Sequence, residues 1–420
     1  MGRKSSVFWI AGEDHDYEEV NHVYLQTPSH EIKKAKLGME PEGKTSITHL
    51  QVEDGLLEAF IETYFAEQID TEFSVELRKG LLGFARESTT LTDFFARVMA
   101  WLFGEKGLVL IDSALPFVRE LEKRGFSRVI KENEALNRAV LEQGNSLAAH
   151  GYHRQVETES DNAHFFLYRQ GQRIGVIRQN GTYQTRDGAE TYTEEELLVL
   201  LEEQPERFST NVVTRPMMQE LLFPTLAFIG GPGEIAYWGL YRRYFELFGL
   251  EMPILLPRLT FSLIEGTVQK TMRKYDMTVE ELFTGLDARR VAYLEQQNTF
   301  NLEEKLAAVK NQIKALYQPI IEDAAKIELG LKNLGEKNVD KILEQVGYYE
   351  KKISGAFLKK HESVLRQFER TEAALFPMDK PQERVYNIFG YVNKYGMDWF
   401  NAFLSYPFEI NRNHNAIFID

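Results

Sequence analysis

The sequence predicts an α/β protein whose Rossmann-like core carries a small inserted antiparallel β meander and a long antiparallel coiled-coil hairpin of helices. Three observations lead to this prediction. Short apolar segments alternate with helix-like segments in two parts of the chain, turn dipeptides separate strand-like segments between those parts, and a heptad pattern begins near residue 300. Such alternation is typical of a parallel sheet covered by helices, and a heptad repeat is typical of paired helices.

The first part of the core is predicted over residues 1–150. β-Branched and aromatic residues at 6–11 indicate a buried strand, and residues 107–112 indicate a second strand that ends in an acid. A helix is expected from Pro116, which suits a first helical turn, to Glu142. Because the first strand begins almost at residue 1, we expect that an N-terminal portion of the core is missing.

An inserted meander and a helix are predicted over residues 151–205. Gln170-Gly171 and Asn180-Gly181 each separate two strand-like runs, and Asn-Gly is a strong hairpin signal. Thr193 and Glu196 have the spacing of a capping box, which predicts that a helix begins there. The core then resumes over residues 206–295, with strands at 225–230 and 254–257 and a helix at 234–248 between them.

The coiled-coil hairpin is predicted over residues 296–375. Apolar residues recur at steps of four and three from Leu302 to Leu334, and the pattern continues from Val339 to Phe357. Residues 335–338 are expected to turn the chain between the two helices. The C-terminal tail, residues 376–420, is expected to pack on the core.

Composition limits the function classes. Lys and Arg number 49 against 63 Asp and Glu, a net charge of −14, so nucleic acid and anionic membranes are not expected partners. The chain has no cysteine, which excludes disulfides, thiolate metal sites and cysteine nucleophiles. No leader peptide or run of about 18 apolar residues is evident, so we expect a cytoplasmic protein.

An acidic cluster follows the first strand directly. Glu13, Asp14, His15 and Asp16 come after Gly12, at a strand end where open α/β sheets bind ligands. Two aspartates flanking a histidine can supply a base, an orienting hydrogen bond or metal ligands. We predict Asp14, His15 and Asp16 as catalytic residues, Glu13 as a substrate-binding residue, and no metal. The alternative interpretation is a solvated acidic loop or a helix N-cap.

A glycine loop lies between the strand at 225–230 and the following helix. A loop of this kind presents backbone N–H groups to an anion, although the sequence matches neither a phosphate loop nor a dinucleotide fingerprint. We predict substrate contacts from Gly231, Gly233 and Glu234. The alternative is a tight turn that packs the helix on the sheet.

Two further segments place polar groups beside apolar runs. Asn211, Thr214 and Arg215 precede one such run, and Arg258 follows the strand at 254–257. An arginine fork can clamp a carboxylate or a phosphate. We predict all four as substrate-binding residues, and a structural salt bridge is the alternative for each arginine.

Four stretches of the sequence together resemble the bacillithiol biosynthesis cysteine-adding enzymes, the BshC family. The resemblance extends over the whole chain and implies a Rossmann-like core related to class I synthetase nucleotidyl transferases, with a helical coiled coil that dimerises. The stretches are Val7–Asn21, Pro205–Pro216, Pro224–Ile235 and Pro381–Arg384.

The resemblance also implies a reaction. The family joins the carboxyl group of L-cysteine to the amine of glucosaminyl malate in the last step of bacillithiol biosynthesis. We therefore expect a ligase that forms a carbon–nitrogen bond, a homodimer, and an acyl intermediate activated by ATP. Family members carry a further N-terminal segment with a nucleotide-binding signature, which this chain lacks.

Two alternatives remain open from the sequence. One is a catalytically impaired, dimeric coiled-coil interaction protein derived from the family. The other is a transferase acting on RNA, which the acidic net charge and the absence of a basic stripe disfavour.

Overall fold

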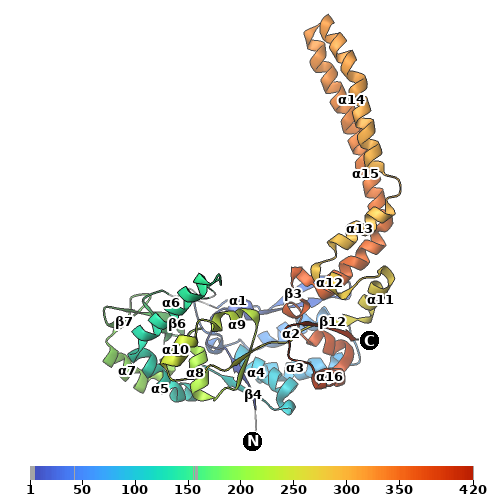
Figure 1. Cartoon of the computed structure of the whole chain (residues 1–420). Helices are drawn as coiled ribbons and strands as arrows, with labels where there is room; N and C mark the ends of the chain where they lie inside the picture. The colour runs from blue at the N-terminus through green and yellow to red at the C-terminus, as the bar shows by residue number, and fades with distance from the viewer. Residues whose placement is uncertain (1–4, 42, 155, 157–158, 420) are drawn as a thin grey trace. The chain divides into compact units, whose positions relative to one another are not determined.

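The computed structural model describes residues 5–41, 43–154, 156 and 159–419. They form two compact units, which we describe separately (Figure 1). Unit 1 takes the chain up to Thr260 and again from Tyr386 to Asn415, and unit 2 takes Phe261–Val385 and the last residues from Ala416. Among the helices of the described residues, none has the length and apolar character needed to cross a membrane.

Two parallel strand pairs in unit 1 confirm the predicted α/β core. β1 (Ser6–Ile10) pairs with β4 (Leu108–Asp112), and β10 (Ala227–Gly230) pairs with β11 (Ile254–Pro257). Parallel pairs need crossover connections, which helices supply here. The first pair is connected through α2 (Leu56–Ala66), α3 (Ser74–Arg86) and α4 (Leu91–Phe103), and the second through α9 (Pro232–Trp238) and α10 (Arg242–Leu247).

The inserted meander is antiparallel, as predicted. Asn180 and Gly181 both have positive φ, 51° and 82°, which a two-residue turn between right-twisted strands requires. The Thr193–Glu196 capping box is formed and begins α7 (Glu194–Glu203). In order across the sheet, the strands are β8 (Thr191–Tyr192), β7 (Thr182–Thr185), β6 (Gln172–Gln179), β5 (Asn162–Arg169) and β9 (Phe208–Thr210).

Unit 1 differs from the prediction in several elements. The helix expected over 116–142 is divided into α5 (Pro116–Lys131) and α6 (Asn133–Ala149), because the buried Asn133 amide donates to the Ala163 carbonyl at 2.8 Å and fixes the chain there. The helix expected over 234–248 is likewise two helices, α9 and α10. The hairpin of β2 (His22–Gln26) and β3 (Ile32–Lys36) has no counterpart in the prediction. The remaining helices of unit 1 are α1 (Tyr17–Val20), α8 (Arg215–Leu222) and α16 (Phe389–Ser405).

Unit 2 contains the predicted hairpin, with its turn in a different place. α14 (Leu302–Ile327) and α15 (Leu329–Leu375) lie side by side and are joined at Glu328, not at residues 335–338 (Figure 1). Gly335 lies inside α15, where an added Cβ would come within 2.7 Å of Ile321. This glycine therefore allows the two helices to approach closely, and it does not form the turn.

The boundary of the core also differs from the prediction. Residues 261–295, expected at the end of the core, belong to unit 2 because Ile264, Met272 and Leu286 pack with Phe368 and Leu375 of α15. The tail is divided, since 386–415 belong to unit 1 and the residues on either side belong to unit 2. The remaining elements are β12 (Thr260–Glu265), α11 (Gly266–Tyr275), α12 (Val279–Thr284), α13 (Asp287–Gln297) and β13 (His414–Ile419), which pairs with β12.

Candidate functional site

A polar cavity of about 220 Å³ lies where the carboxyl ends of strands from both parallel pairs converge with the meander. Ligands of α/β sheets bind at such strand ends. Segments distant in the sequence therefore share one site. The cavity is lined by Trp9, Ala11, Glu13, Asp14, Ser113, Arg173, Thr210, Asn211, Val212, Arg215, Glu234 and Tyr237.

Glu13 reaches this cavity from the loop after β1, but its carboxylate is already bonded to protein groups. It forms an ion pair with Arg119 at 2.5 Å and accepts hydrogen bonds from the Ser209 hydroxyl at 2.5 Å and the Thr210 amide at 2.8 Å. Burial by itself would raise the pKa of Glu13, but Arg119 and the Ser209 hydroxyl outweigh it and lower the pKa to about 2. Glu13 is therefore a buried, ionised anchor that joins β1 to β9 and α5.

Glu122 is a second buried carboxyl group beside the same arginine. Its side chain accepts a hydrogen bond from Arg119. Burial raises the pKa of Glu122 to about 8, against the opposing effect of the Arg119 charge. One guanidinium cannot neutralise two buried anions, so Glu13 holds the negative charge and Glu122 is mainly protonated at neutral pH.

Asp14 turns the other way and lies at the edge of the cavity. Its side chain is 57% exposed, and its Oδ1 accepts from Arg173 Nη1 at 3.0 Å. Arg173 comes from β6 and is buried, with further bonds to the Ser209 hydroxyl and the Thr210 carbonyl. The Arg173 guanidinium also lies over the Phe166 ring, with its Cζ atom 4.0 Å from the ring centroid. This cation–π contact fixes the guanidinium plane.

His15 meets the same arginine. Arg173 Nη1 lies 3.4 Å from His15 Nδ1, and because arginine can only donate, Nδ1 must accept. Burial and then the Arg173 charge lower the pKa of His15, so the neutral ring carries its proton on Nε2. His15, which was predicted as catalytic, is not among the residues that line the cavity. Asp14 does line it and retains a carboxylate oxygen, Oδ2, to which the described residues donate no hydrogen bond.

Two charged groups form another wall of the cavity, and neither is ion-paired with a described residue. Arg215 donates weakly to Gln219 and to Tyr237, at 3.3 and 3.4 Å, and forms no ion pair with a described residue. Glu234 accepts from the Gly231 amide at 2.9 Å and also has no cation paired with it in the described part of the chain. The Asn211 carbonyl oxygen binds the Val213 and Thr214 amides, so its NH₂ group is left as a donor. This wall can bind one anion and one cation of a ligand.

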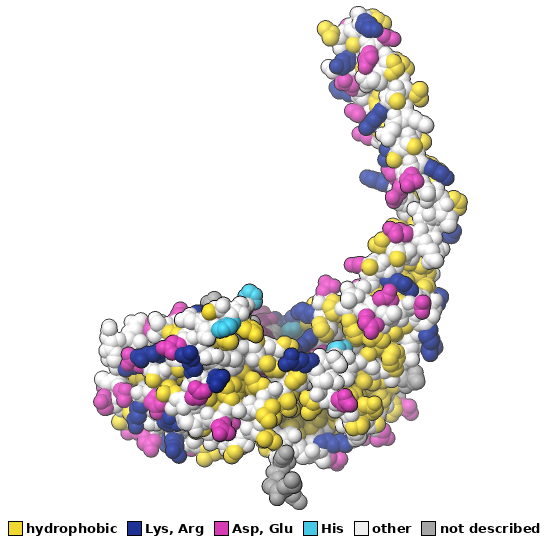
Figure 2. All heavy atoms as spheres, in the orientation of Figure 1, with side chains coloured by type: hydrophobic (Ala, Val, Ile, Leu, Met, Phe, Trp, Pro, Cys, Tyr) yellow, Lys and Arg dark blue, Asp and Glu magenta, His cyan; other side chains and the backbone are white. Residues whose placement is uncertain are grey.

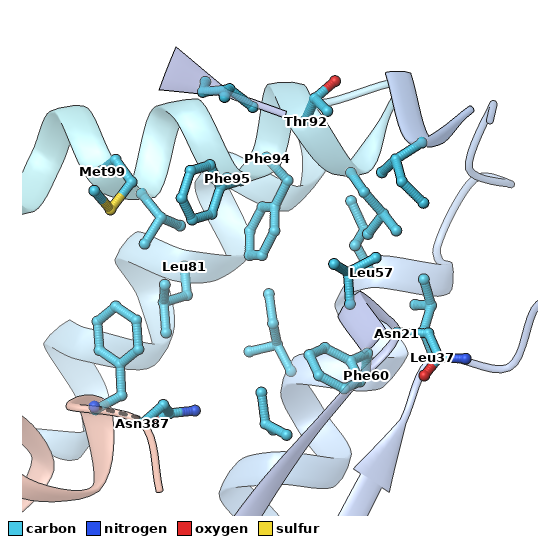
Figure 3. A pocket seen from close by; sticks show the side chains of 18 of the residues that line it. Asn21, Leu37, Leu57, Phe60, Leu81, Thr92, Phe94, Phe95, Met99 and Asn387 are labelled. Atoms are coloured by element: carbon cyan, nitrogen blue, oxygen red, sulfur yellow. Dashed lines mark hydrogen bonds between the residues drawn. The ribbon is translucent and has the colours of Figure 1, made fainter. Parts of the chain in front are cut away.

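A much larger cavity beside β1 has a different character. It encloses about 620 Å³ and is almost entirely apolar. Figure 3 shows Leu57 and Phe60 of α2, Leu81 of α3, and Phe94 and Phe95 of α4 around it. It contains no charged side chain, so it offers no groups for acid–base chemistry, and the smaller polar cavity is the candidate site.

Comparison with known proteins identifies the family. The family model described as "Bacillithiol biosynthesis BshC, N-terminal Rossmann-like domain" matches residues 6–259, and the one described as "Bacillithiol biosynthesis BshC, C-terminal coiled-coil domain" matches residues 261–419. The chain belongs to the BshC family. Both the fold class and the suspected family are thereby confirmed. The border between the two matches coincides with the first border between the units, at residues 260 and 261, whereas residues 386–415 of unit 1 lie inside the second match.

Three relatives that match nearly the whole chain have the same name. "Putative cysteine ligase BshC" of Bacillus velezensis is 35% identical over 98% of this chain and 76% of its own length. The proteins of the same name from Bacillus cytotoxicus and a Geobacillus strain are 36% and 33% identical, over 98% of this chain and 76% and 77% of their own lengths.

Several predicted site residues of this BshC-family chain lie outside the cavity. Asp16 is exposed at the start of α1 and makes no capping bond. Thr214 is buried and donates to the His164 carbonyl at 2.8 Å. Gly231 donates to Glu234, Gly233 faces open space, and Arg258 is exposed after β11. Among the described residues, no group of three or more His, Asp or Glu side chains could hold a metal ion.

The sequence did not identify Arg173, Arg119 or Tyr237 as members of this site. Arg173 lies 159 residues from Asp14, in a meander that was interpreted as a separate insertion. The sequence did contain one indication of its role, because Arg173 occupies an inward-facing position of an otherwise apolar strand. Arg119 and Glu122 lie three residues apart on the buried face of α5, and charged residues on such a face indicate a buried ion pair.

Proposed function

We propose that this protein joins L-cysteine to glucosaminyl malate through an amide bond, in the last step of bacillithiol biosynthesis. The observation that carries the proposal is a pair of charged groups in the polar cavity that form no ion pair with a described residue. Arg215 and Glu234 complement the carboxylate and the ammonium of an α-amino acid, and a cavity of about 220 Å³ suits a small one. The name of the relatives, cysteine ligase, supports the same amino acid.

Asp14 is the group we assign to the amine proton. An amine must lose a proton as it attacks a carboxyl carbon, and a positioned carboxylate can accept it. The Arg173 guanidinium orients Asp14 through Oδ1 and leaves Oδ2 for this task. His15 contacts the same arginine but does not line the cavity, so we assign it no contact with a substrate and no role as the base.

ATP remains our proposed co-substrate, because a carboxylate oxygen leaves poorly without activation. The glycine loop does not fit its phosphates. The Gly231 amide is already bonded to Glu234, and that carboxylate covers the start of α9, a helix of only 7 residues. We therefore assign no step to this loop, and its role is to hold Glu234 in place.

We also propose that the protein is a homodimer joined through the hairpin. Leu316, Ile327, Leu329 and Leu334 are large apolar residues on α14 and α15 that are 63–82% exposed. Figure 2 shows apolar side chains among charged ones over the hairpin surface. Exposed apolar positions of this kind favour helix–helix association. A purely structural protein is less well supported, because it would not need unpartnered charges in a cavity.

A turnover assay tests the proposed function. Purified chain is mixed with L-cysteine and glucosaminyl malate, with and without ATP, and products are measured by mass spectrometry. We expect a product whose mass equals the two substrates less one water, formed only with ATP. If no such product forms while both substrates bind, the assigned reaction is wrong.

A further inference from the structure

Tyr237 lines the polar cavity, and the proposed reaction does not use it. It lies on α9 one turn after Glu234, so the two side chains emerge on the same side of this short helix. The Tyr237 hydroxyl oxygen accepts a hydrogen bond from Arg215 Nη2 at 3.4 Å. Through this bond, the helix that carries Glu234 contacts Arg215 at the start of α8.

The charges of Arg215 and Glu234 both act on the Tyr237 hydroxyl. Burial raises the pKa of this group, the Arg215 charge lowers the pKa, and the Glu234 charge raises it. Because the pKa lies above its ordinary value, the hydroxyl keeps its proton at neutral pH. A neutral hydroxyl accepts from one group and donates to another. Tyr237 can therefore bond to the guanidinium while its proton is available to a carboxylate.

Neutral groups hold the two charges of this wall. Glu234 accepts from the Gly231 amide at 2.9 Å, and Arg215 donates to Gln219 at 3.3 Å and lies with its Cζ atom 5.7 Å from the centroid of the Phe228 ring. Opposite charges that face one cavity of about 220 Å³ attract each other. Arg215 and Glu234 nevertheless form no ion pair with each other or with another described residue.

The same three residue types meet elsewhere in unit 1 and do form an ion pair. Arg207 Nη1 donates to the Tyr192 hydroxyl at 3.5 Å, and Arg207 Nη2 donates to the two carboxylate oxygens of Glu190 at 2.9 and 3.0 Å. A tyrosine beside an arginine and a glutamate therefore does not by itself prevent the pair. The open arrangement is a property of the polar cavity.

We propose that Tyr237 is a positioning residue that keeps Arg215 from pairing with Glu234, so that the cavity selects a zwitterion, a molecule with both a carboxylate and an ammonium group. A free α-amino acid brings both charges and bonds to both groups, whereas a ligand with one charge leaves the other group unused. The inference rests on the proposed function and deepens it, because it explains how the site would take a free amino acid.

Selection of a zwitterion is tested by calorimetric titration of the full chain with three probes. They are L-cysteine, 3-mercaptopropionate, which lacks the ammonium group, and cysteamine, which lacks the carboxylate. We expect L-cysteine to bind roughly tenfold more tightly than either of the others, as for one additional charged hydrogen bond. Equal affinity for L-cysteine and one of the single-charge probes would overturn the selection.

The role of Tyr237 is tested by Tyr237→Phe, which keeps the ring and removes the hydroxyl. Arg215 should then pair with Glu234, so L-cysteine and 3-mercaptopropionate should each bind roughly tenfold more weakly, and the KM for cysteine should rise with kcat within about twofold. Tyr192→Phe removes a hydroxyl that also contacts an arginine, and as the matched control it should leave all three values unchanged. Unchanged affinities in Tyr237→Phe would overturn the proposal.

A second substitution separates positioning from direct contact with the ligand. Glu234→Gln removes the competing carboxylate, so it should strengthen the binding of 3-mercaptopropionate roughly tenfold in the Tyr237→Phe background and less than about twofold in the wild type. The same effect in both backgrounds would show that Tyr237 does not hold the two charges apart.

Failure of this inference can be told from failure of the proposed function. If the wild type binds the probes as expected but forms no product, the assigned reaction is wrong and the zwitterion site stands. If product forms and Tyr237→Phe binds L-cysteine as tightly as the wild type, the reaction stands and the role of Tyr237 is wrong.

Discussion

Glu13 and Asp14 are adjacent in the sequence but belong to two regions of unit 1 with opposite properties. Glu13 lies in a buried cluster with Arg119 and Glu122, where every charge is compensated by protein groups. Asp14 lies in the polar cavity, where Arg215 and Glu234 form no ion pair with any residue that the structure describes. Ser209 connects the two regions, since it donates to Glu13 and accepts from Arg173.

The difference shows how one short motif can serve stability and chemistry together. A buried ion that is fully bonded contributes to the fold but cannot contact a ligand, because its lone pairs are occupied. A charged group at the edge of the cavity remains able to bond to a ligand. While the cavity is empty, that group lowers the stability of the protein. The predictions below test this division, beginning with the largest expected effect.

The largest effect should come from the buried cluster. Arg119→Met leaves the ionised Glu13 carboxylate buried without its cation, and breaking a buried pair costs about 3–5 kcal/mol of unfolding free energy. Chemical denaturation measures the loss. The control is Glu18→Gln, which removes a carboxylate that is 72% exposed and paired with Lys36, and the loss of stability should be much smaller because solvent screens the pair. Equal losses in the two variants would remove the distinction between the regions.

A substitution in the cavity should weaken substrate binding and leave the stability of the protein nearly unchanged. Arg215→Gln removes the charge proposed to hold the cysteine carboxylate, so the KM for cysteine should rise by roughly 10- to 100-fold, the range of a hydrogen bond to a charged group. The melting temperature should change little because Arg215 has no ion pair to lose. A large fall in melting temperature with an unchanged KM would place Arg215 in the structural region instead.

The protonation of the buried cluster can be tested by pH. The pKa of Glu122 is raised to about 8 in the folded state, so its stabilising contribution is present below its ordinary value and is lost as pH rises through 8. Glu122→Gln mimics the protonated form and should melt a few degrees above the wild type at pH 9 but close to it at pH 5. Parallel melting curves across this range would show that Glu122 is already ionised.

The smallest effect on unit 1 should come from the hairpin. Leu329→Glu, at a residue that is 82% exposed, should shift the mass measured by light scattering from dimer toward monomer. Val75→Glu, at a residue of α3 that is 78% exposed, is the matched control and should leave the mass unchanged. A monomeric wild type would contradict the dimer proposal without affecting the cavity.

Strand ends were predictable from the sequence because apolar runs bounded by glycine are local signals. Glu13, Asp14 and Glu234 follow strands of the parallel pairs and line one cavity, as expected where the carboxyl ends of parallel strands share an edge. Asn211 and Arg215 line the same cavity but follow β9, a strand of the antiparallel sheet, so this rule does not account for them. That any of these residues binds a substrate stays a prediction. The sequence could not show that Glu13 is buried and bonded to protein groups while Asp14 is exposed at the cavity. Which of two adjacent carboxylates is buried depends on Arg119 and Arg173, whose positions follow from the tertiary structure.

Errors in the prediction have similar causes. Gly335 was interpreted as a turn because glycine is a helix breaker in isolation, but Ile321 on the facing helix leaves room for nothing larger. The break after Glu132 is fixed by a hydrogen bond from Asn133 to Ala163, thirty residues away.

The most direct test of this account compares Asp14→Asn with Asp16→Asn in the product-forming assay. The sequence analysis predicts the same role for both aspartates, but of the two only Asp14 lines the cavity and contacts Arg173. We predict that Asp14→Asn folds normally and loses roughly 100-fold or more in kcat, as for a lost general base, while Asp16→Asn retains wild-type turnover. Equal activity in the two variants would contradict the assignment of the cavity as the site of ligation.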